Sequence, residues 1–347
     1  MTRLAVVADD LTGALDAAAP FAARGLSTVV ALGVDGLEAA LASGAAVIGV
    51  STDSREIAPE LAQQAVAECV SRLPAGLEIF KKVDSRLKGN IAEELDALRF
   101  ERALVVPAIP AFGRVVRDGR VEGFGVAEPI DIASRLGRHA QAAIIPDATS
   151  QIEIEHAVAG LEHDLLIGAR ALAEAVAADM APSAVLVPGW SMEAPAICVI
   201  GSIDPITLAQ IERLRAQSPE LSYIAAPDGQ LPEQLPASAP LTLLQAVPGV
   251  TEKADPVQVA ERLGEALLRL QPQAGTTLFI SGGATAQTVL RKLGIAVLEL
   301  LGEALPGLPI ARAGGFTIIT KSGGFGDAET LVDLFGHFGG LQRERHG

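Results

Sequence analysis

The stretch "RLAVVADDLTGALDAAAPFAARG" (3–25) indicates the fold of the first part of the chain. Its apolar run, 3–8, is followed by two adjacent carboxylates and then by a helical pattern that ends at Gly25. A run of this length that is apolar after Arg3 predicts a buried strand, and buried strands that alternate with helices are typical of parallel α/β sheets. The sequence therefore predicts an α/β fold.

The same alternation continues outward from this stretch. Further strands are predicted at 27–32, 45–52, 77–83, 102–107 and at the start of 164–179, and helices at 59–73, 90–100 and in the rest of 164–179. A second series has strands at 196–201, 221–226, 241–246, 276–281 and 316–320, with helices at 204–217, 255–270, 284–294 and 327–338. Residues 107–129 are rich in Gly and Pro and are predicted to form a long irregular loop, of the kind that is usually functional or mobile. Residues 180–195 are predicted to form a linker.

A chain of 347 residues is too long for one ordinary core. We expect two domains, 1–180 and 195–347, each a mainly parallel sheet flanked by helices. The 3% aromatic content and the net charge of -15 argue against a nucleic-acid partner. No apolar stretch reaches the roughly 18 residues of a membrane span, and the start is too short in apolar residues for a signal peptide. Cys69 and Cys198 form no CxxC pair and the histidines no metal pattern, so we expect a cytoplasmic protein without structural zinc.

Charged side chains follow three of the predicted N-terminal strands, at the edge where open α/β sheets bind ligands. Asp9 and Asp10 follow the first; one acid there would be explained as a helix cap, but two are not. "STDSR" (51–55) brings Arg55, which can pair with a carboxylate but by itself is explained as a surface arginine. "KKVDSRLKGN" (81–90) places Lys81, Lys82, Arg86 and Lys88 before a helix, which indicates an anion site, with a solvated charged turn as the alternative.

Two glycine turns mark the second half of the chain. "FISGGATAQTVL" (279–290) and "ITKSGGFGDAETL" (319–331) both read as strand, Gly-Gly turn and helix. Backbone N–H groups at such turns approach an anion closely, so the pair indicates phosphate binding. Neither stretch matches GxxxxGK[ST] or GxGxxG, which argues against an ordinary P-loop and a nicotinamide-dependent dehydrogenase.

Six motifs together resemble the four-carbon acid sugar kinases. They are "ADDLTGALD" (8–16), "STDSRE" (51–56), "KKVDSRLKGN" (81–90), "VIGSIDPITLAQIE" (199–212), "SGGATAQTVLRKLG" (281–294) and "TKSGGFGDAETL" (320–331). The resemblance implies a substrate domain, a nucleotide domain and an active site in the cleft between them. It implies that the sugar acid is bound by Asp9, Asp10, Arg55, Lys82, Asp84, Ser85 and Arg86, with Asp10 and Asp84 catalytic. It implies that the nucleotide is bound by Ser202, Gly282, Gly283, Ala284, Thr285, Gly323, Gly324, Phe325 and Gly326.

The implied activity is ATP- and Mg²⁺-dependent phosphorylation of threonate, erythronate or 3-oxo-tetronate, by a cytoplasmic protein that we expect to be a homo-oligomer, a dimer. The chain departs from the family pattern in two places. Ala284 replaces the usual Asp of Gly-Gly-Asp-Thr-Ala, and the segment around 113–135 is shortened. The alternative is a divergent relative that binds a sugar acid or nucleotide without phosphoryl transfer.

Overall fold

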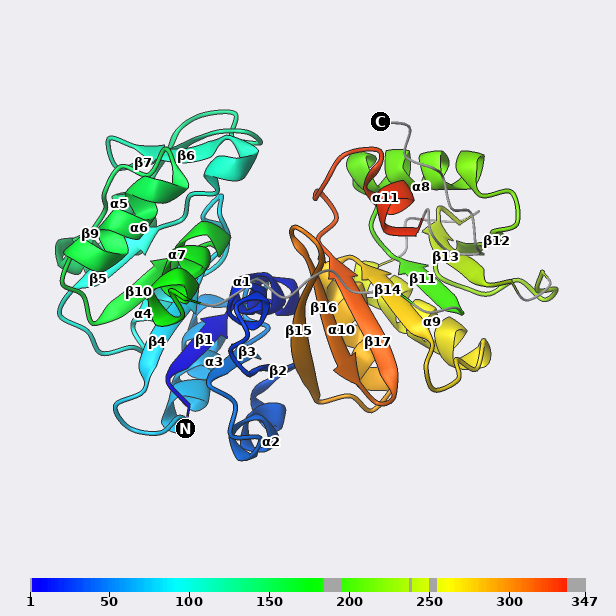
Figure 1. Cartoon of the computed structure of the whole chain (residues 1–347), viewed down its shortest axis with the longest axis horizontal. Helices are drawn as coiled ribbons and strands as arrows, with labels where there is room; N and C mark the ends of the chain where they lie inside the picture. The colour runs from blue at the N-terminus through cyan, green and yellow to red at the C-terminus, as the bar shows by residue number, and fades with distance from the viewer. Residues whose placement is uncertain (1, 184–191, 193–194, 237–238, 250–254, 336–347) are drawn as a thin grey trace. The chain divides into compact units, whose positions relative to one another are not determined.

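The computed structural model describes residues 2–183, 192, 195–236, 239–249 and 255–335. The chain forms two compact units, Met1–Val187 with Ala296–Gly302, and Pro188–Ile295 with Glu303–Gly347. Each unit contains a mainly parallel sheet flanked by helices, which confirms the predicted fold class (Figure 1). Every strand predicted from the sequence is present.

The sheet of the first unit has β1 in its interior, between β3 and β4. Its strands lie in the order β15 (Val297–Leu305), β2 (Thr28–Ala31), β3 (Val47–Ser51), β1 (Leu4–Ala8), β4 (Glu78–Lys82), β10 (Leu165–Gly168), β5 (Ala103–Val106) and β9 (Ala143–Ile144). All of these neighbours pair in parallel except β15 with β2. The chain runs from β1 to β2 and β3 on one side of β1 and then to β4 on the other side. The carboxyl end of β1 is therefore a topological switch point, where such sheets bind ligands.

The helices of this unit pack in two groups. In one group α1 (Leu11–Ala23) packs on α7 (Arg170–Met180), which packs on α6 (Gln151–Gly160). In the other, α3 (Pro59–Ser71) packs on α4 (Ile91–Leu95), which contacts α5 (Ile132–Leu136); α2 (Leu37–Ala42) lies beside β2. The predicted helix 90–100 is therefore shorter than expected, because α4 ends at Leu95.

The prediction of an irregular loop over 107–129 is wrong. After a short 3-10 turn at Pro110–Phe112, the segment forms an antiparallel sheet of β6 (Arg114–Arg117), β7 (Arg120–Gly123) and β8 (Ile130–Asp131). Asp118 and Gly119, both with positive φ, make the two-residue turn. An Asp-Gly pair flanked by alternating apolar residues, here Val116 and Val121, is a strong hairpin signal, and the Gly and Pro content of the surrounding residues concealed it.

The second unit orders its strands as β12 (Ser222–Pro227), β13 (Leu241–Val247), β11 (Ala196–Ile200), β14 (Thr277–Ser281), β17 (Phe316–Lys321) and β16 (Leu308–Ala313). On this sheet α9 (Pro256–Arg269) packs on α10 (Gly283–Lys292), and α8 (Pro205–Gln217) lies beside α11 (Thr330–Phe335) (Figure 1). The predicted linker 180–195 and the end of helix 327–338 lie largely outside the described residues. No described helix has the length and apolar character needed to cross a membrane.

Strand register brings the predicted motifs to the same edge within each unit. Ala8 of β1 aligns with Ser51 of β3 and with Lys82 of β4. In the second unit Ser281 of β14 aligns with Ile200 of β11 and Lys321 of β17. The residues that follow these positions therefore emerge as neighbours, in each unit by itself.

Candidate functional site

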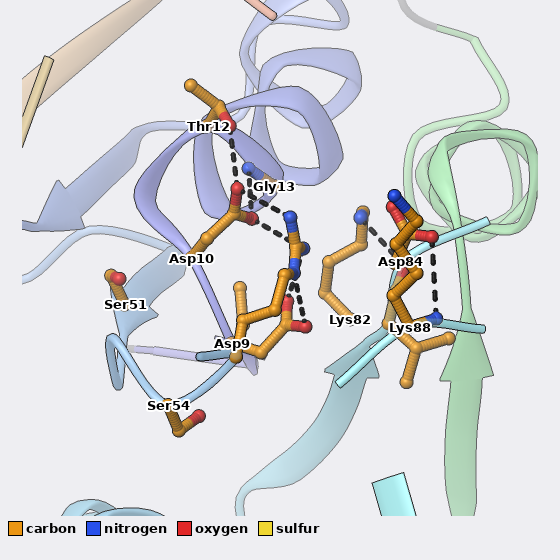
Figure 2. Close-up of polar contacts among 12 residues, drawn as sticks. Asp9, Asp10, Thr12, Gly13, Ser51, Ser54, Lys82, Asp84 and Lys88 are labelled. Carbon is orange, nitrogen blue, oxygen red and sulfur yellow. Dashed lines mark hydrogen bonds and ion pairs between the residues drawn. The ribbon is translucent and has the colours of Figure 1, made fainter. Parts of the chain in front are cut away.

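Arg55 joins the two carboxylates that follow β1. Its Nε and Nη2 donate to Asp9 Oδ2 and Oδ1 at 2.8 and 2.7 Å, and its Nη1 and Nη2 donate to Asp10 Oδ2 and Oδ1 at 2.9 Å each. Figure 2 shows the Asp9 and Asp10 carboxylates near each other, and the ion pairs of Arg55 join them at 2.7 and 2.9 Å. The structure therefore brings together two of the sequence motifs that were predicted to form one site.

Asp10 is also the N-cap of α1. Its Oδ1 accepts from Gly13 N at 2.9 Å and its Oδ2 from Thr12 Oγ1 at 2.8 Å (Figure 2). With the two bonds from Arg55, the Asp10 carboxylate accepts four hydrogen bonds, which fills its lone-pair positions. The capping interpretation thus holds for Asp10, while Asp9 serves no cap.

Asp9 is buried, with 2% of its surface exposed. Burial by itself would raise the pKa of Asp9, but the hydrogen bonds and charge of Arg55, together with Lys81 and Lys82, hold it below its ordinary value of 3.8. The same contacts raise the pKa of Arg55 against the effect of its own burial. Both groups are therefore ionised at neutral pH.

The loop after β4 closes over this pair. Asp84 Oδ1 accepts the backbone N–H of Arg86 at 2.9 Å and of Lys88 at 3.5 Å, which folds the loop back on itself. Asp84 and Lys88 lie next to each other in Figure 2. Gly89 has φ +92 and lies so close to Arg55 and Asp9 that a Cβ there would be 3.2 Å from Asp9 Oδ2. Lys82 Nζ donates to the Val83 carbonyl at 2.8 Å and would lie 3.2 Å from a Cβ on Gly13.

Arg114 is a site residue that the sequence analysis missed. Its Nη1 donates to Ser85 Oγ at 2.6 Å, while Nε and Nη2 donate to the Phe124 carbonyl at 3.0 and 2.8 Å. Burial and the nearby charge of Arg86 lower the pKa of Arg114, and Asp84 offsets them in part. The signal that could have found it is the Asp-Gly hairpin, which begins at this residue.

A buried network of hydrogen bonds and one ion pair holds the backbone next to Arg55. Glu94, at the centre of this network, is a second residue that the sequence did not reveal. Lys81 and Glu94 form an ion pair at 2.8 Å with 0% and 1% of their side-chain surfaces exposed. Ser54 Oγ donates to Glu94 Oε1, and Ser54 N donates to the Asp9 carbonyl at 2.9 Å. Asn90 Nδ2 donates to the Ser54 carbonyl at 2.9 Å. The backbone that carries Arg55 is therefore fixed on both sides.

The charges around this site do not balance. Its cations are Arg55, Lys82, Arg86 and Arg114, and its carboxylates are Asp9, Asp10 and Asp84. Lys81 and Glu94 neutralise each other and leave this sum unchanged. A surplus of cations, in which the charge of Arg86 lies close enough to lower the pKa of Arg114, favours an anionic ligand.

The predicted nucleotide residues of the second unit also lie together. Gly282 has φ +108 and precedes α10, whose first turn has no side-chain cap. A Cβ on Gly282 would lie 3.5 Å from Ser202 N and 3.3 Å from Thr285 Oγ1, and a Cβ on Gly323 would overlap Ser202 Oγ. Ala284 is exposed in the first turn of α10. An uncapped helix N-terminus between glycine turns suits a phosphate.

The loop Ser322–Asp327 is held from α8. Thr207 Oγ1 donates to the Gly323 carbonyl at 2.6 Å, and Gln210 Nε2 donates to the Phe325 and Asp327 carbonyls at 2.9 and 2.7 Å. Lys321, immediately before the loop, is buried beneath it. The part of the chain that the structure describes contains no group of three or more His, Cys, Asp or Glu side chains able to hold a metal by themselves.

Comparisons with known proteins match the two parts of the chain to two different family models. Residues 4–130 match the family described as Sugar-binding N-terminal domain, and residues 233–331 match Nucleotide-binding C-terminal domain. D-threonate kinase of Bordetella bronchiseptica is 29% identical over 95% of this chain and 96% of its own length. 3-oxo-tetronate kinase of Methylobacterium radiotolerans is 29% identical over 96% of this chain and 97% of its own.

Among solved structures, a Haemophilus influenzae protein shares the fold with a TM-score of 0.67 and 21% identity, covering 96% of this chain and 100% of that one. A Salmonella typhimurium protein described as a putative tRNA synthase has a TM-score of 0.74 and 19% identity, covering 97% and 100%. These two likenesses concern the fold alone. With both domain matches and end-to-end similarity to named kinases, the chain belongs to the four-carbon acid sugar kinase family.

Proposed function

We propose that this protein is an ATP-dependent kinase that phosphorylates a hydroxyl group of a four-carbon sugar acid of the threonate, erythronate or 3-oxo-tetronate type. The first unit would bind the acid and the second the nucleotide. The proposal rests on the family and on the kinase names of relatives that match nearly the whole chain. The cleft between the domains and the dimer stay predictions.

The observation that carries the proposal is the cationic surplus beside a fixed pair of carboxylates at the switch point of the first unit. A sugar acid has one carboxylate and several hydroxyls. Arg86 and Arg114 offer donors of the kind that bind a carboxylate, and Arg114 already donates to Ser85 next to Arg86. Asp9 is buried and accepts two hydrogen bonds from Arg55, so it fixes the guanidinium beside these donors.

We propose different roles for Asp10 and Asp84, the two acids that the family resemblance implies are catalytic. Asp10 accepts four hydrogen bonds and holds α1 and Arg55 in place, so we assign it an anchoring role. Asp84 uses Oδ1 for the loop and is half-buried, which leaves Oδ2 to accept the proton of an attacking hydroxyl. Phosphoryl transfer depends mainly on positioning and charge neutralisation, with such a residue orienting the nucleophile.

In the second unit the nucleotide's phosphates would lie at the uncapped start of α10 and the Ser322–Asp327 loop. Mg²⁺ is bound in kinases by one or two carboxylates together with the phosphates. Asp204 fits this requirement, because Oδ1 accepts from Ile206 N while Oδ2 would be 3.2 Å from a Cβ on Gly324. When bound, the ion would neutralise developing phosphate charge.

The test is ADP release with Mg·ATP and a panel of D- and L-threonate, D- and L-erythronate and 3-oxo-tetronates. We expect turnover with at least one acid and none with uncharged tetritols, because these lack the carboxylate. The Asp84→Asn variant should lose about 100-fold or more in kcat while its KM for the acid changes little. Binding of ATP without turnover on any acid would contradict the kinase assignment.

One observation favours a second function, namely binding without transfer. Ala284 stands where the family usually has an acid, at an exposed position on the first turn of α10. If that acid is indispensable, calorimetry will detect both ligands while no ADP forms.

A further inference from the structure

Lys321 is a buried cation to which the proposed function assigns no role. It ends β17 directly before the glycine loop, and 1% of its surface is exposed. Its Nζ donates to four oxygens: Thr207 Oγ1 at 2.9 Å, and the carbonyls of Ser322, Gly323 and Phe325 at 3.0, 2.9 and 3.2 Å. It does not reach the solvent side of the loop, where a phosphate would bind.

The four acceptors resemble the ligands of a monovalent cation. All are neutral oxygens, and three are backbone carbonyls from one short loop. Rings of carbonyl oxygens replace the hydration shell of K⁺ in the same way. An ammonium has three N–H donors for these four oxygens, so the fit depends on charge as well as on individual hydrogen bonds. The charged group that acts on Lys321 is Asp204, at the N-cap of α8.

The contacts of Lys321 orient the loop for an anion. In a planar trans peptide the C=O and N–H point in opposite directions. Because the carbonyls of Ser322, Gly323 and Phe325 face Nζ, the N–H groups of the following residues, Gly323, Gly324 and Gly326, face away from it. No described residue accepts a hydrogen bond from these three N–H groups. Successive N–H groups turned to one side form a concave anion site.

Neighbouring residues secure this orientation but carry no charge. Thr207 and Gln210 bind loop carbonyls from α8, and the ring of Phe325 lies against Gly307, where a Cβ would overlap it. The cation at the centre of the loop is thus supplied by Lys321.

We propose that the Lys321 ammonium is a tethered ion in a monovalent-cation site, and that this cation shapes the backbone anion site of the Ser322–Asp327 loop. The proposal rests on the proposed function for the identity of the anion, a nucleotide phosphate. It makes Lys321 a positioning residue that acts through the loop. It also implies that wild-type protein binds nucleotide equally well in K⁺ and in Na⁺, because the site is already filled.

The experiment removes the tether and supplies free cations. Lys321→Ala leaves a gap that n-propylammonium, NH₄⁺ or K⁺ can fill, whereas Lys321→Met fills the gap with an uncharged chain of similar length. In NaCl we expect both variants to lose about tenfold or more in ATP affinity by calorimetry. In propylammonium, ammonium or potassium chloride at equal ionic strength, K321A should regain most of that affinity and K321M should not. Lys292→Ala is the control, since Lys292 is a cation of the same unit that pairs at the surface with Glu261 and Glu265.

A second readout needs no nucleotide and so separates this inference from the kinase assignment. Without ATP, the thermal midpoint of K321A should rise with propylammonium or ammonium concentration more than with Na⁺, while those of wild type and K321M should not. A protein that bound no ATP would still show this response. Unchanged ATP affinity in K321A, a loss that no cation relieves, or wild-type ATP binding that depends on K⁺ would overturn the inference. The comparison of wild-type ATP binding in K⁺ and in Na⁺ tests the inference even if K321A does not fold.

Discussion

Arg55 and Asp9 form a bidentate pair in which Nε and Nη2 bind the two carboxylate oxygens at 2.8 and 2.7 Å. The pair is 19% and 2% exposed, and it links the loop after β3 to the end of β1. Because the same guanidinium also binds Asp10, one side chain fixes the strand, the first turn of α1 and the adjacent loop. Two acids in succession are thus explained by one shared arginine.

Arg55→Lys should disrupt the sugar-acid site and leave the nucleotide site intact. A lysine supplies one point charge in place of a planar fork and cannot bind both carboxylates in this geometry. We expect KM for the acid to rise by about 10-fold to 100-fold with ATP affinity unchanged. Arg72→Lys is the matched control, because Arg72 pairs with Glu68 at the surface. Equal loss of both ligands in R55K would contradict the division of roles between the units.

Asp9 should contribute to stability in a pH-dependent way. Its pKa in the folded protein lies below 3.8, so below about pH 4 the unfolded chain binds more protons than the folded one. Its contribution to the free energy of unfolding is therefore complete above 3.8 and is lost as the pH falls through the folded pKa. Urea unfolding of wild type and Asp9→Asn at pH 7, 4.5 and 3.5 should show the difference between them shrinking only at the lowest pH. A constant difference would refute the prediction.

Glu94→Gln should destabilise the first unit strongly. It leaves Lys81 charged and buried with its partner neutralised, and breaking such a pair costs about 3–5 kcal/mol. The double variant Lys81→Met, Glu94→Leu should recover much of this, because it removes both charges from the core. Glu162→Gln provides the control, since Glu162 and Arg102 are exposed and their pair contributes less than about 1 kcal/mol. Chemical denaturation measures all four proteins.

The sequence predicted the parts of this molecule whose signals are local. The apolar runs before Asp9, Ser51 and Gly282 indicated strands because burial alone specifies them, and strand order then brought their ends together. Strand β15 was missed because Val297–Leu300 is specified by pairing with β2, more than 250 residues earlier in the chain. Glu94 and Arg114 were missed for the same reason, since each is defined by a partner across a crossover or hairpin. Lys321 stood inside a quoted motif, but its burial and four acceptors are visible only in three dimensions.

Ala284→Asp should raise turnover if the family's acid at this position promotes the reaction. Ala284 is exposed on the first turn of α10, so a carboxylate can be accommodated there without displacing the core. We expect kcat with the preferred sugar acid to increase by about tenfold. Ala284→Asn, which has the same shape without the charge, should have no such effect. Equal rates for the Asp and Asn variants would show that charge at this position is unimportant.

Lys321 should give nucleotide binding and stability opposite dependences on pH. Burial lowers the pKa of Lys321 to about 8, and Asp204 offsets this in part. As pH rises from 7 to 9 the ammonium is lost and the loop carbonyls lose their donor, so ATP affinity should fall. Between about pH 8 and 10.5 the unfolded chain, with its ordinary lysine pKa, binds the proton that the folded protein has released. The Lys321 contribution to the free energy of unfolding should therefore increase over that window. Both trends should be absent in Lys321→Met, which calorimetry and urea unfolding across pH 7 to 10 can check; a variant that keeps either trend would assign the titration to another group.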